Sequence, residues 1–193
     1  MTARLPPKPR EQLTPEQQEM HDLYGKATKT VFGEAGGSFI FEEADGSYNG
    51  PLPFFAYLPS AGRSLFAQMS AIGKLPIPPD AREVAILTTG AHFKAGYETY
   101  SHIPQAVHLA GLSQQQAEEL AVGKKPDGLS AEGSVTYDMA TYLTNIPGPL
   151  PQEIWDRAVK VLGKETVVGL LHYIGFYAYV SIGLNAVDAA VPE

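Results

Sequence analysis

The sequence predicts an all-α protein. Apolar residues recur every three or four positions along most of the 193 residues, as they do on the buried face of a helix. Strand signals are few, and several segments begin with residues that typically start a helix, such as Thr14, Ser113 and Ser130. Together these observations indicate about seven or eight helices.

Residues 1–50 are expected to form an N-terminal arm that carries one helix. The three prolines in residues 1–10 favour an extended chain. Thr14 is a suitable N-cap, Pro15 a suitable first residue, and Gln17 lies three residues after the cap. The helix that begins there should end near residue 31 or 32.

A loop, a helix and a proline-rich break are expected next. Residues 33–53 are rich in glycine and acidic residues, which indicates a loop with a short extended piece at 38–42. Apolar spacing predicts a helix over 60–72. The prolines in residues 75–80 then interrupt the chain. We expect residues 51–193 to form one helical domain.

The remaining helices should follow this break. Asp80 is expected to cap the first of them, and Gly96 to interrupt it. The expected segments are 82–112, 113–122, a helix starting at 130, 151–162 and 164–185.

The last of these segments is apolar almost all round. Such a helix should be deeply buried or lie at a subunit interface. Its glycines Gly169, Gly175 and Gly183 would allow close approach of another helix. We expect the helix to carry four polar groups inward, namely His172, Tyr173, Tyr177 and Asn185.

Composition excludes several classes of function. The net charge of −7 argues against nucleic-acid binding, because no basic surface is available to neutralise phosphates. The absence of cysteine excludes disulfides, thiol catalysis, zinc–thiolate sites and iron–sulfur clusters. The N-terminus lacks the apolar core of a signal peptide, and no apolar run is expected to reach the length needed to span a bilayer. A cytoplasmic protein with no membrane partner is therefore expected.

The segment 82–112 holds most of the residues that could carry chemistry. Glu98 and His102 are four residues apart, so on a helix their side chains lie on one face. An imidazole that titrates near neutral pH, next to a carboxylate, is a usable acid/base pair. The same spacing is common on solvated helix faces. It could also supply two metal ligands, but no second pair of ligands lies nearby in the sequence, so we expect no metal.

Three pieces of the sequence resemble the carboxymuconolactone decarboxylase family, which shares its fold with alkylhydroperoxidase D. They are REVAILTTGAHFKAGYETYSH, HLAGLS and LLHYIGFYAYVSIGLNAVDAAVP, and they occur in the family's order over about residues 50–193. The resemblance implies an alkylhydroperoxidase D-like helical bundle that assembles as a trimer or hexamer. It implies a small carboxylic acid or lactone as substrate, and no cofactor.

The resemblance also implies roles for individual residues. The peroxidase branch uses a glutamate, two cysteines and a histidine, and alignment on Glu83 and His102 puts Ala95 and Glu98 at the cysteine positions. Thiol-dependent peroxidase activity is then not available, and proton transfer is expected instead. His102 would donate a proton or stabilise an oxyanion, Glu98 would orient it or relay the proton, and Glu83 would be a further partner or base.

Other side chains are expected to bind the substrate. The candidate carboxylate anchors are Arg82 and Lys94, although Lys94 also fits a solvated surface position. The candidate pocket residues are His92, Tyr97, His172 and Tyr177, with Phe93 and Tyr100 as further aromatic walls. His21 and His108 are expected at the surface.

The leading hypothesis is a cofactor-free lyase, a decarboxylase, or an isomerase acting on a small lactone or keto acid by proton transfer. The alternative from a different class is a non-catalytic oligomeric binding or stress-linked protein that kept the fold and lost the activity. A thiol-independent peroxidase is a third hypothesis.

Overall fold

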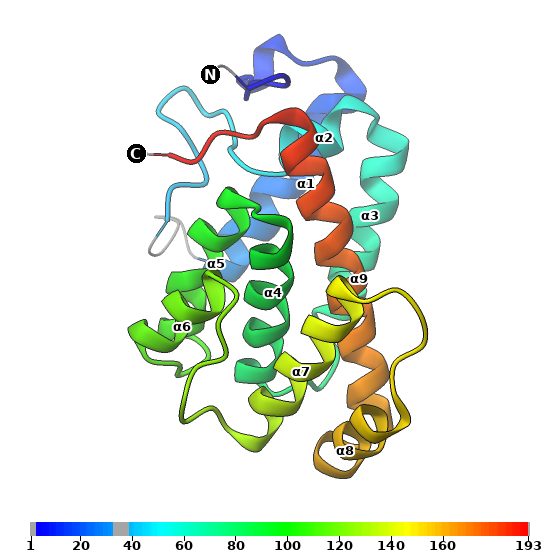
Figure 1. Cartoon of the computed structure of the whole chain (residues 1–193). Coiled ribbons are helices and arrows are strands. Elements are labelled where there is room, and N and C mark those ends of the chain that lie inside the picture. Colours follow the sequence, from blue (N-terminus) through cyan, green and yellow to red (C-terminus); the bar gives the residue numbers. More distant parts are fainter. Residues whose placement is uncertain (1–2, 33–38, 193) are drawn as a thin grey trace. The chain divides into compact units, whose positions relative to one another are not determined.

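The computed structural model describes residues 3–32 and 39–192. Within these residues the chain is helical, with no strand beyond an isolated bridge between Glu42 and Tyr48, so the predicted all-α class is confirmed (Figure 1). The elements are η1 (Arg10–Gln12), α1 (Pro15–Phe32), α2 (Leu52–Tyr57), α3 (Pro59–Ile72), α4 (Pro79–Phe93), α5 (Gly96–His108), α6 (Gln114–Ala121), α7 (Ala131–Asn145), α8 (Gln152–Leu162) and α9 (Lys164–Val187).

Two compact units make up the chain. One comprises Met1–Ala71 and Gly183–Glu193, and the other comprises Ile72–Ile182. The first unit therefore holds α1, α2, α3 and the last turn of α9, whereas the second holds α4 to α8 and most of α9. The domain boundary expected at residue 50 stays a prediction.

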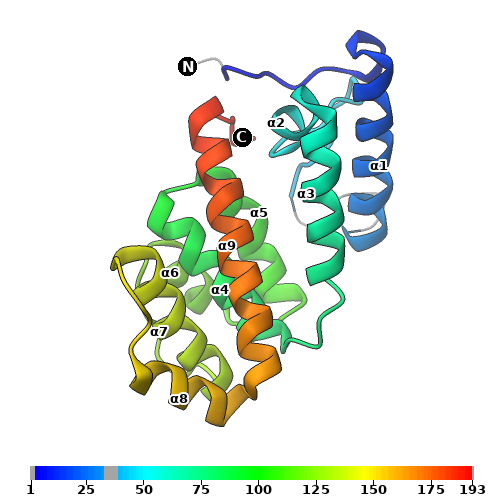
Figure 2. The ribbon, with the colours of Figure 1, turned by 90° about the vertical axis from the view of Figure 1, so that its right-hand side faces the viewer.

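In the first unit, α1 and α3 lie side by side (Figure 2). The predicted capping box of α1 is present: the Gln17 N–H donates to Thr14 Oγ1 at 3.4 Å, and the Thr14 N–H donates to Gln17 Oε1 at 3.1 Å. His21, expected at the surface, is buried instead. Its Nε2 lies 3.0 Å from the Gly46 carbonyl oxygen and its ring 4.5 Å from that of Tyr48, because this face of α1 packs on the loop that follows it.

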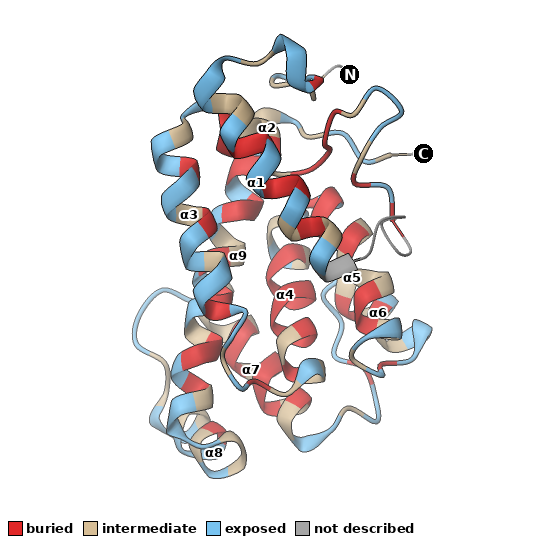
Figure 3. Ribbon diagram, turned by 180° about the vertical axis from the view of Figure 1, so that it is seen from behind, coloured by how far each residue is buried: buried red, intermediate tan, exposed pale blue. Residues whose placement is uncertain are grey.

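In the second unit, α4 is the central helix. Its middle residues, from Glu83 to Gly90, are all buried (Figure 3). No other helix of this unit has so long an uninterrupted run of buried residues. Helix α4 packs against α5, α6 and α7, and α8 packs on α7. A cluster of buried residues joins α4, α5, α6 and α7: Val84, Leu87, Ala106, Leu112, Ala117, Leu120 and Tyr137.

The starts of α4 and α7 are joined by a polar contact. Asp80 was predicted to cap α4, but the helix begins two residues earlier than that, with Pro78 at the N-cap position and Pro79 as its first residue. Asp80 instead accepts a hydrogen bond from the Ser130 hydroxyl. Ser130 caps α7 as predicted, accepting the Gly133 N–H at 2.9 Å. The Ser130 hydroxyl thus forms hydrogen bonds with residues of both α4 and α7.

The inward face of α9 differs from the prediction. Tyr173 is buried and Tyr177 partly so, but His172 and Asn185 are exposed. By length and hydropathy alone, α9 would suffice to cross a membrane, so the expectation that no apolar run reaches that length was wrong. More than half of its most apolar window, 56%, is buried, and core helices of soluble proteins meet the same criterion.

The shared role of Ser130 can be tested by Ser130→Ala. This change leaves an N–H of α7 and the Asp80 carboxylate without their partner, so we expect the free energy of unfolding to fall by ~1–2 kcal/mol. Urea denaturation measures this loss. The matched control is Ser134→Ala in the same helix, expected within ~0.5 kcal/mol of wild type. Equal effects of the two changes would contradict the assignment.

Candidate functional site

The turn between α4 and α5 brings the predicted acid and base residues together. Lys94 ends α4 in the left-handed conformation, with φ 53°, and α5 begins at Gly96. The two helices therefore fold back on each other. Glu83 lies in the first turn and a half of α4, whereas Glu98 and His102 lie on α5.

His102 lies between two glutamates. Its Nδ1 is 2.8 Å from Glu83 Oε2, which is a hydrogen bond, and its Nε2 is 3.7 Å from Glu98 Oε2. Arg82 Nε lies 3.4 Å from the other oxygen of Glu83. The side chains of Glu83 and Glu98 are 5% exposed and that of His102 is 13% exposed, so the three charges interact with little screening by water. We call Glu83, Glu98 and His102 the buried triad.

Burial and mutual charge set the protonation of the triad. Burial raises the pKa of Glu98 to about 7, an effect that the charge of Glu83 reinforces and that of His102 opposes. Burial alone would lower the pKa of His102, but the charge and hydrogen bond of Glu83, together with Glu98, outweigh it and raise the pKa. These shifts favour a protonated imidazole, beside a carboxyl that gains and loses its proton near neutral pH.

Tyr177 of α9 contacts the His102 ring, and Tyr173 of the same helix contacts Tyr177. The Tyr177 ring meets the His102 ring edge to face at 5.2 Å, and the Tyr173 ring stacks on Tyr177 at 6.2 Å. Burial, reinforced by Glu98 and Glu83, raises the pKa of Tyr177 well above its usual value. Its hydroxyl therefore stays protonated and can donate a hydrogen bond, but cannot act as a base.

A glycine of α4 allows this arrangement. A Cβ atom at Gly90 would lie 3.2 Å from Cβ of Glu98, closer than such atoms normally approach. The missing side chain lets the start of α5 pack against α4, and so fixes the backbone of Glu98.

The remaining predicted site residues are divided between this region and the surface. Arg82 is half-buried beside Glu83, and Tyr97 is buried with its ring 5.9 Å from that of Tyr100. His92 is exposed at the end of α4, where its Nδ1 lies 3.0 Å from Asn145 Oδ1. Lys94 and His108 are exposed, as expected for surface residues.

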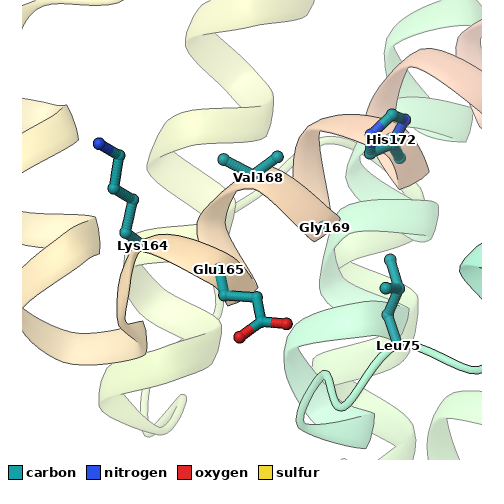
Figure 4. A pocket seen from close by; sticks show the side chains of 6 residues that line it. All are labelled: Leu75, Lys164, Glu165, Val168, Gly169 and His172. Atoms are coloured by element: carbon teal, nitrogen blue, oxygen red, sulfur yellow. The ribbon is translucent and has the colours of Figure 1, made fainter.

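His172 lies in a different place from the triad. It borders an open surface hollow of about 500 Å³ in the second unit, together with Leu75, Lys164, Glu165, Val168 and Gly169 (Figure 4). None of the triad residues lines this hollow. In the part of the chain that the structure describes, no three histidine or acidic side chains are grouped around a common metal position.

Tyr173 was not singled out as a site residue by the sequence. Burial raises its pKa, while the charge of Arg82 and a hydrogen bond with it oppose the shift, so Tyr173 connects Arg82 to the Tyr177 ring. The signal that could have found it is its spacing: Tyr173 and Tyr177 are four residues apart on one helix face.

Comparison with solved structures identifies the fold. A peroxidase-related protein from Ralstonia eutropha JMP134 with an alkylhydroperoxidase AhpD core has a TM-score of 0.75 at 14% identity, covering 100% of this chain and 94% of that one. The debrominase Bmp8 in complex with 2,3,4-tribromopyrrole has a TM-score of 0.72 at 12% identity, covering 100% and 93%. A peroxidase-related protein from Silicibacter sp. TM1040 has a TM-score of 0.72 at 14% identity, covering 90% and 85%.

The chain therefore has an alkylhydroperoxidase D-like fold, as the sequence predicted. By sequence it matches no protein-family model and no curated protein. At these low identities the similarity concerns the fold alone.

The raised pKa of Glu98 makes stability depend on pH. The folded chain keeps this proton up to about pH 7, whereas an unfolded glutamate releases it near 4.5. The folded state therefore binds more protons in this window, and its stability falls as pH rises through it, by ~3 kcal/mol in full. In Glu98→Gln the side chain stays neutral, so we expect its stability relative to wild type to rise by ~1–3 kcal/mol between pH 5 and pH 8.

Urea denaturation at the two pH values measures this change. Glu118→Gln, at an exposed position of α6, is the control and should show no such dependence. A difference between Glu98→Gln and wild type that is the same at both pH values would contradict the raised pKa.

Proposed function

We propose that this protein is a cofactor-free enzyme that transfers protons to or from carbon in a small lactone or keto acid, as a decarboxylating lyase or an isomerase. The observation that carries the proposal is the buried triad. Its imidazole donates Nδ1–H to Glu83 at 2.8 Å and directs Nε2 toward Glu98, 3.7 Å away. That second distance is too long for a hydrogen bond, so Nε2 lies close to Glu98 without being bonded to it.

The two ring nitrogens have different roles in this proposal. Because Nδ1 is engaged with Glu83, the mobile proton is the one on Nε2. Burial raises the pKa of Glu98 to about 7, so this carboxyl gives up or accepts a proton near neutral pH. It can therefore return a proton to Nε2 after each reaction. Glu83, next to Arg82, stabilises the charged imidazolium.

A decarboxylation would use these groups as follows. The bond to the leaving carboxylate breaks, CO2 departs, and the electron pair moves onto the carbonyl oxygen as an enolate. The protonated imidazole and the neutral Tyr177 hydroxyl are hydrogen-bond donors that can stabilise that oxygen. The carbon then takes the proton from Nε2. An isomerisation would use the same groups to remove a proton from one carbon and return it to another.

Other features support proton chemistry and a modestly charged substrate. The chain has no cysteine, so a thiol cannot carry the reaction. Arg82 is the cation whose charge affects the pKa values of His102, Tyr173 and Tyr177. A single cation at the site fits a substrate with one carboxylate better than a substrate with three carboxylates. Bmp8, with its bound tribromopyrrole, supports including small cyclic compounds of low charge among the test substrates.

One observation favours the alternative of a non-catalytic binding protein. The open hollow on α9 does not include the triad, and the His102 side chain is only 13% exposed. A protein that binds a ligand at the hollow would keep the triad as a structural ion cluster. The two proposals differ in whether the triad turns over a substrate.

The test measures CO2 release and ultraviolet spectra with carboxymuconolactone and related lactone and keto acids. In parallel, proton NMR in D2O detects exchange of carbon-bound hydrogen, which an isomerase would also catalyse. We expect His102→Gln to lower the rate of the active substrate by at least about 100-fold, because it removes the proton donor. His108→Gln, on the same helix but exposed, should leave the rate unchanged.

The outcomes separate the two functions. Turnover that survives in His102→Gln would contradict the role of the triad. Folded wild-type protein that neither releases CO2 nor exchanges hydrogen with any of these compounds would favour the non-catalytic alternative.

A further inference from the structure

One face of α9 is exposed along its length. The exposed positions alternate at spacings of three and four residues, while the positions between them are buried or half-buried. We call them the α9 stripe: Glu165, Val168, His172, Gly175, Tyr179 and Ile182. Three of these side chains are large and apolar or aromatic, with exposed fractions of 41% for Val168, 43% for Tyr179 and 56% for Ile182. All six belong to the second unit.

The alternating spacing is the pattern of a helix that packs along one other helix. In such a pair, residues three and four apart form a single seam that faces the neighbour. A stripe this narrow fits one helix rather than a sheet or a flat surface.

The stripe is complementary to itself when reversed. If two copies of α9 run antiparallel with their Gly175 residues opposite each other, Val168 of each faces Ile182 of the other. His172 then lies within one residue of Tyr179 of the other copy. Each contact occurs twice, which is the geometry of a two-fold, isologous interface. A parallel pair would set every stripe residue against its own copy, including Glu165 against Glu165 near the helix start.

Gly175 permits close approach at the centre of this pair. A Cβ atom built there meets no atom within 4 Å, so the backbone faces open space. Two helices can come closest where both lack a side chain.

The surface hollow beside α9 can receive the Ile182 side chain of the second copy. It is lined by Leu75, which precedes α4, and by Lys164, Glu165, Val168, Gly169 and His172 of the first half of α9 (Figure 4). In the antiparallel register Ile182 of the second copy lies opposite Val168, and therefore at this hollow. Its volume of about 500 Å³ is ample for an isoleucine side chain with its neighbours. Each copy would thus fill the hollow of the other.

Charge favours the same direction. Lys164 begins α9 and Asp188 follows its last residue, Val187. In an antiparallel pair each lysine comes near the acidic, carbonyl-bearing end of the other helix, which is an attractive arrangement.

From these observations we infer that two copies of this chain associate through the α9 stripe, antiparallel about a two-fold axis at Gly175, with Ile182 of each copy seated in the hollow of the other. The inference does not depend on the proposed catalytic function, since no triad residue belongs to the stripe.

Multi-angle light scattering and sedimentation velocity on the full chain test the association. We expect a mass of an even number of chains, at least twice the 20.8 kDa of one chain. Ile182→Glu puts a carboxylate into the hollow and should halve this mass, raising the dissociation constant by roughly 100-fold. Val122→Glu, at an apolar position that is 69% exposed and outside the stripe, is the control and should keep the wild-type mass.

Two further variants test the register. In Val168→Lys/Ile182→Glu the introduced charges of opposite sign face each other only in the antiparallel pair, so the double variant should recover the wild-type mass. Because the chain has no cysteine, Gly175→Cys gives a single thiol on the proposed axis. It should form a disulfide-linked dimer on oxidation, whereas Val122→Cys should not.

Several results would overturn the inference. They are a 20.8 kDa mass or a mass of three chains for wild type, an unchanged mass for folded Ile182→Glu, or equal cross-linking of the two cysteine variants. Binding of wild-type protein to phosphatidylcholine vesicles that Ile182→Glu abolishes, without any self-association in solution, would assign the stripe to a membrane instead.

Discussion

The hydrogen bond between His102 and Glu83 is the interaction on which the rest of the candidate site depends. It joins α4 to α5 across 2.8 Å in a region where both side chains are largely buried. A buried imidazolium is stable only beside a carboxylate, and Glu83 fills that role for His102. Burial is the cause that raises the pKa of Glu98; the charge of His102 opposes the rise and that of Glu83 adds to it.

Within the buried triad, the two glutamates have different roles in the proposed mechanism. Glu83 and Arg82 hold one side of the imidazole, and Glu98 faces the other at a distance that leaves the second nitrogen free to exchange a proton. The Tyr177 ring contacts His102, and its neutral hydroxyl can donate a hydrogen bond. An alkylhydroperoxidase D-like fold without cysteine therefore still has a concentrated set of acid and base groups, and the proposed chemistry requires no redox centre.

The sequence predicted the features that local chemistry determines. The Ser113 and Ser130 caps and the Glu98–His102 pair depend on spacing within one helix, and the structure has all three. The sequence alone could not predict features that depend on contacts between residues far apart in the chain. The contact of Glu83 with His102 requires a tight turn at Lys94, and a lysine does not signal a left-handed conformation. The inward face of α9 was also beyond prediction, because a helix that is apolar almost all round has no preferred side, and His172 faces outward.

The central claim is that the triad holds a mobile proton near neutral pH, and its most direct measurement is the titration of Glu98 and His102 by NMR. Glutamate side chains labelled with 13C at the carboxyl, assigned with Glu98→Gln, report the Glu98 pKa, and 15N-labelled histidine reports which ring nitrogen carries a proton. We expect a Glu98 carboxyl that titrates at about pH 7, beside a His102 that at pH 6 carries a proton on both Nδ1 and Nε2. A Glu98 that titrates near 4.5, or a His102 that is neutral at pH 6, would contradict it.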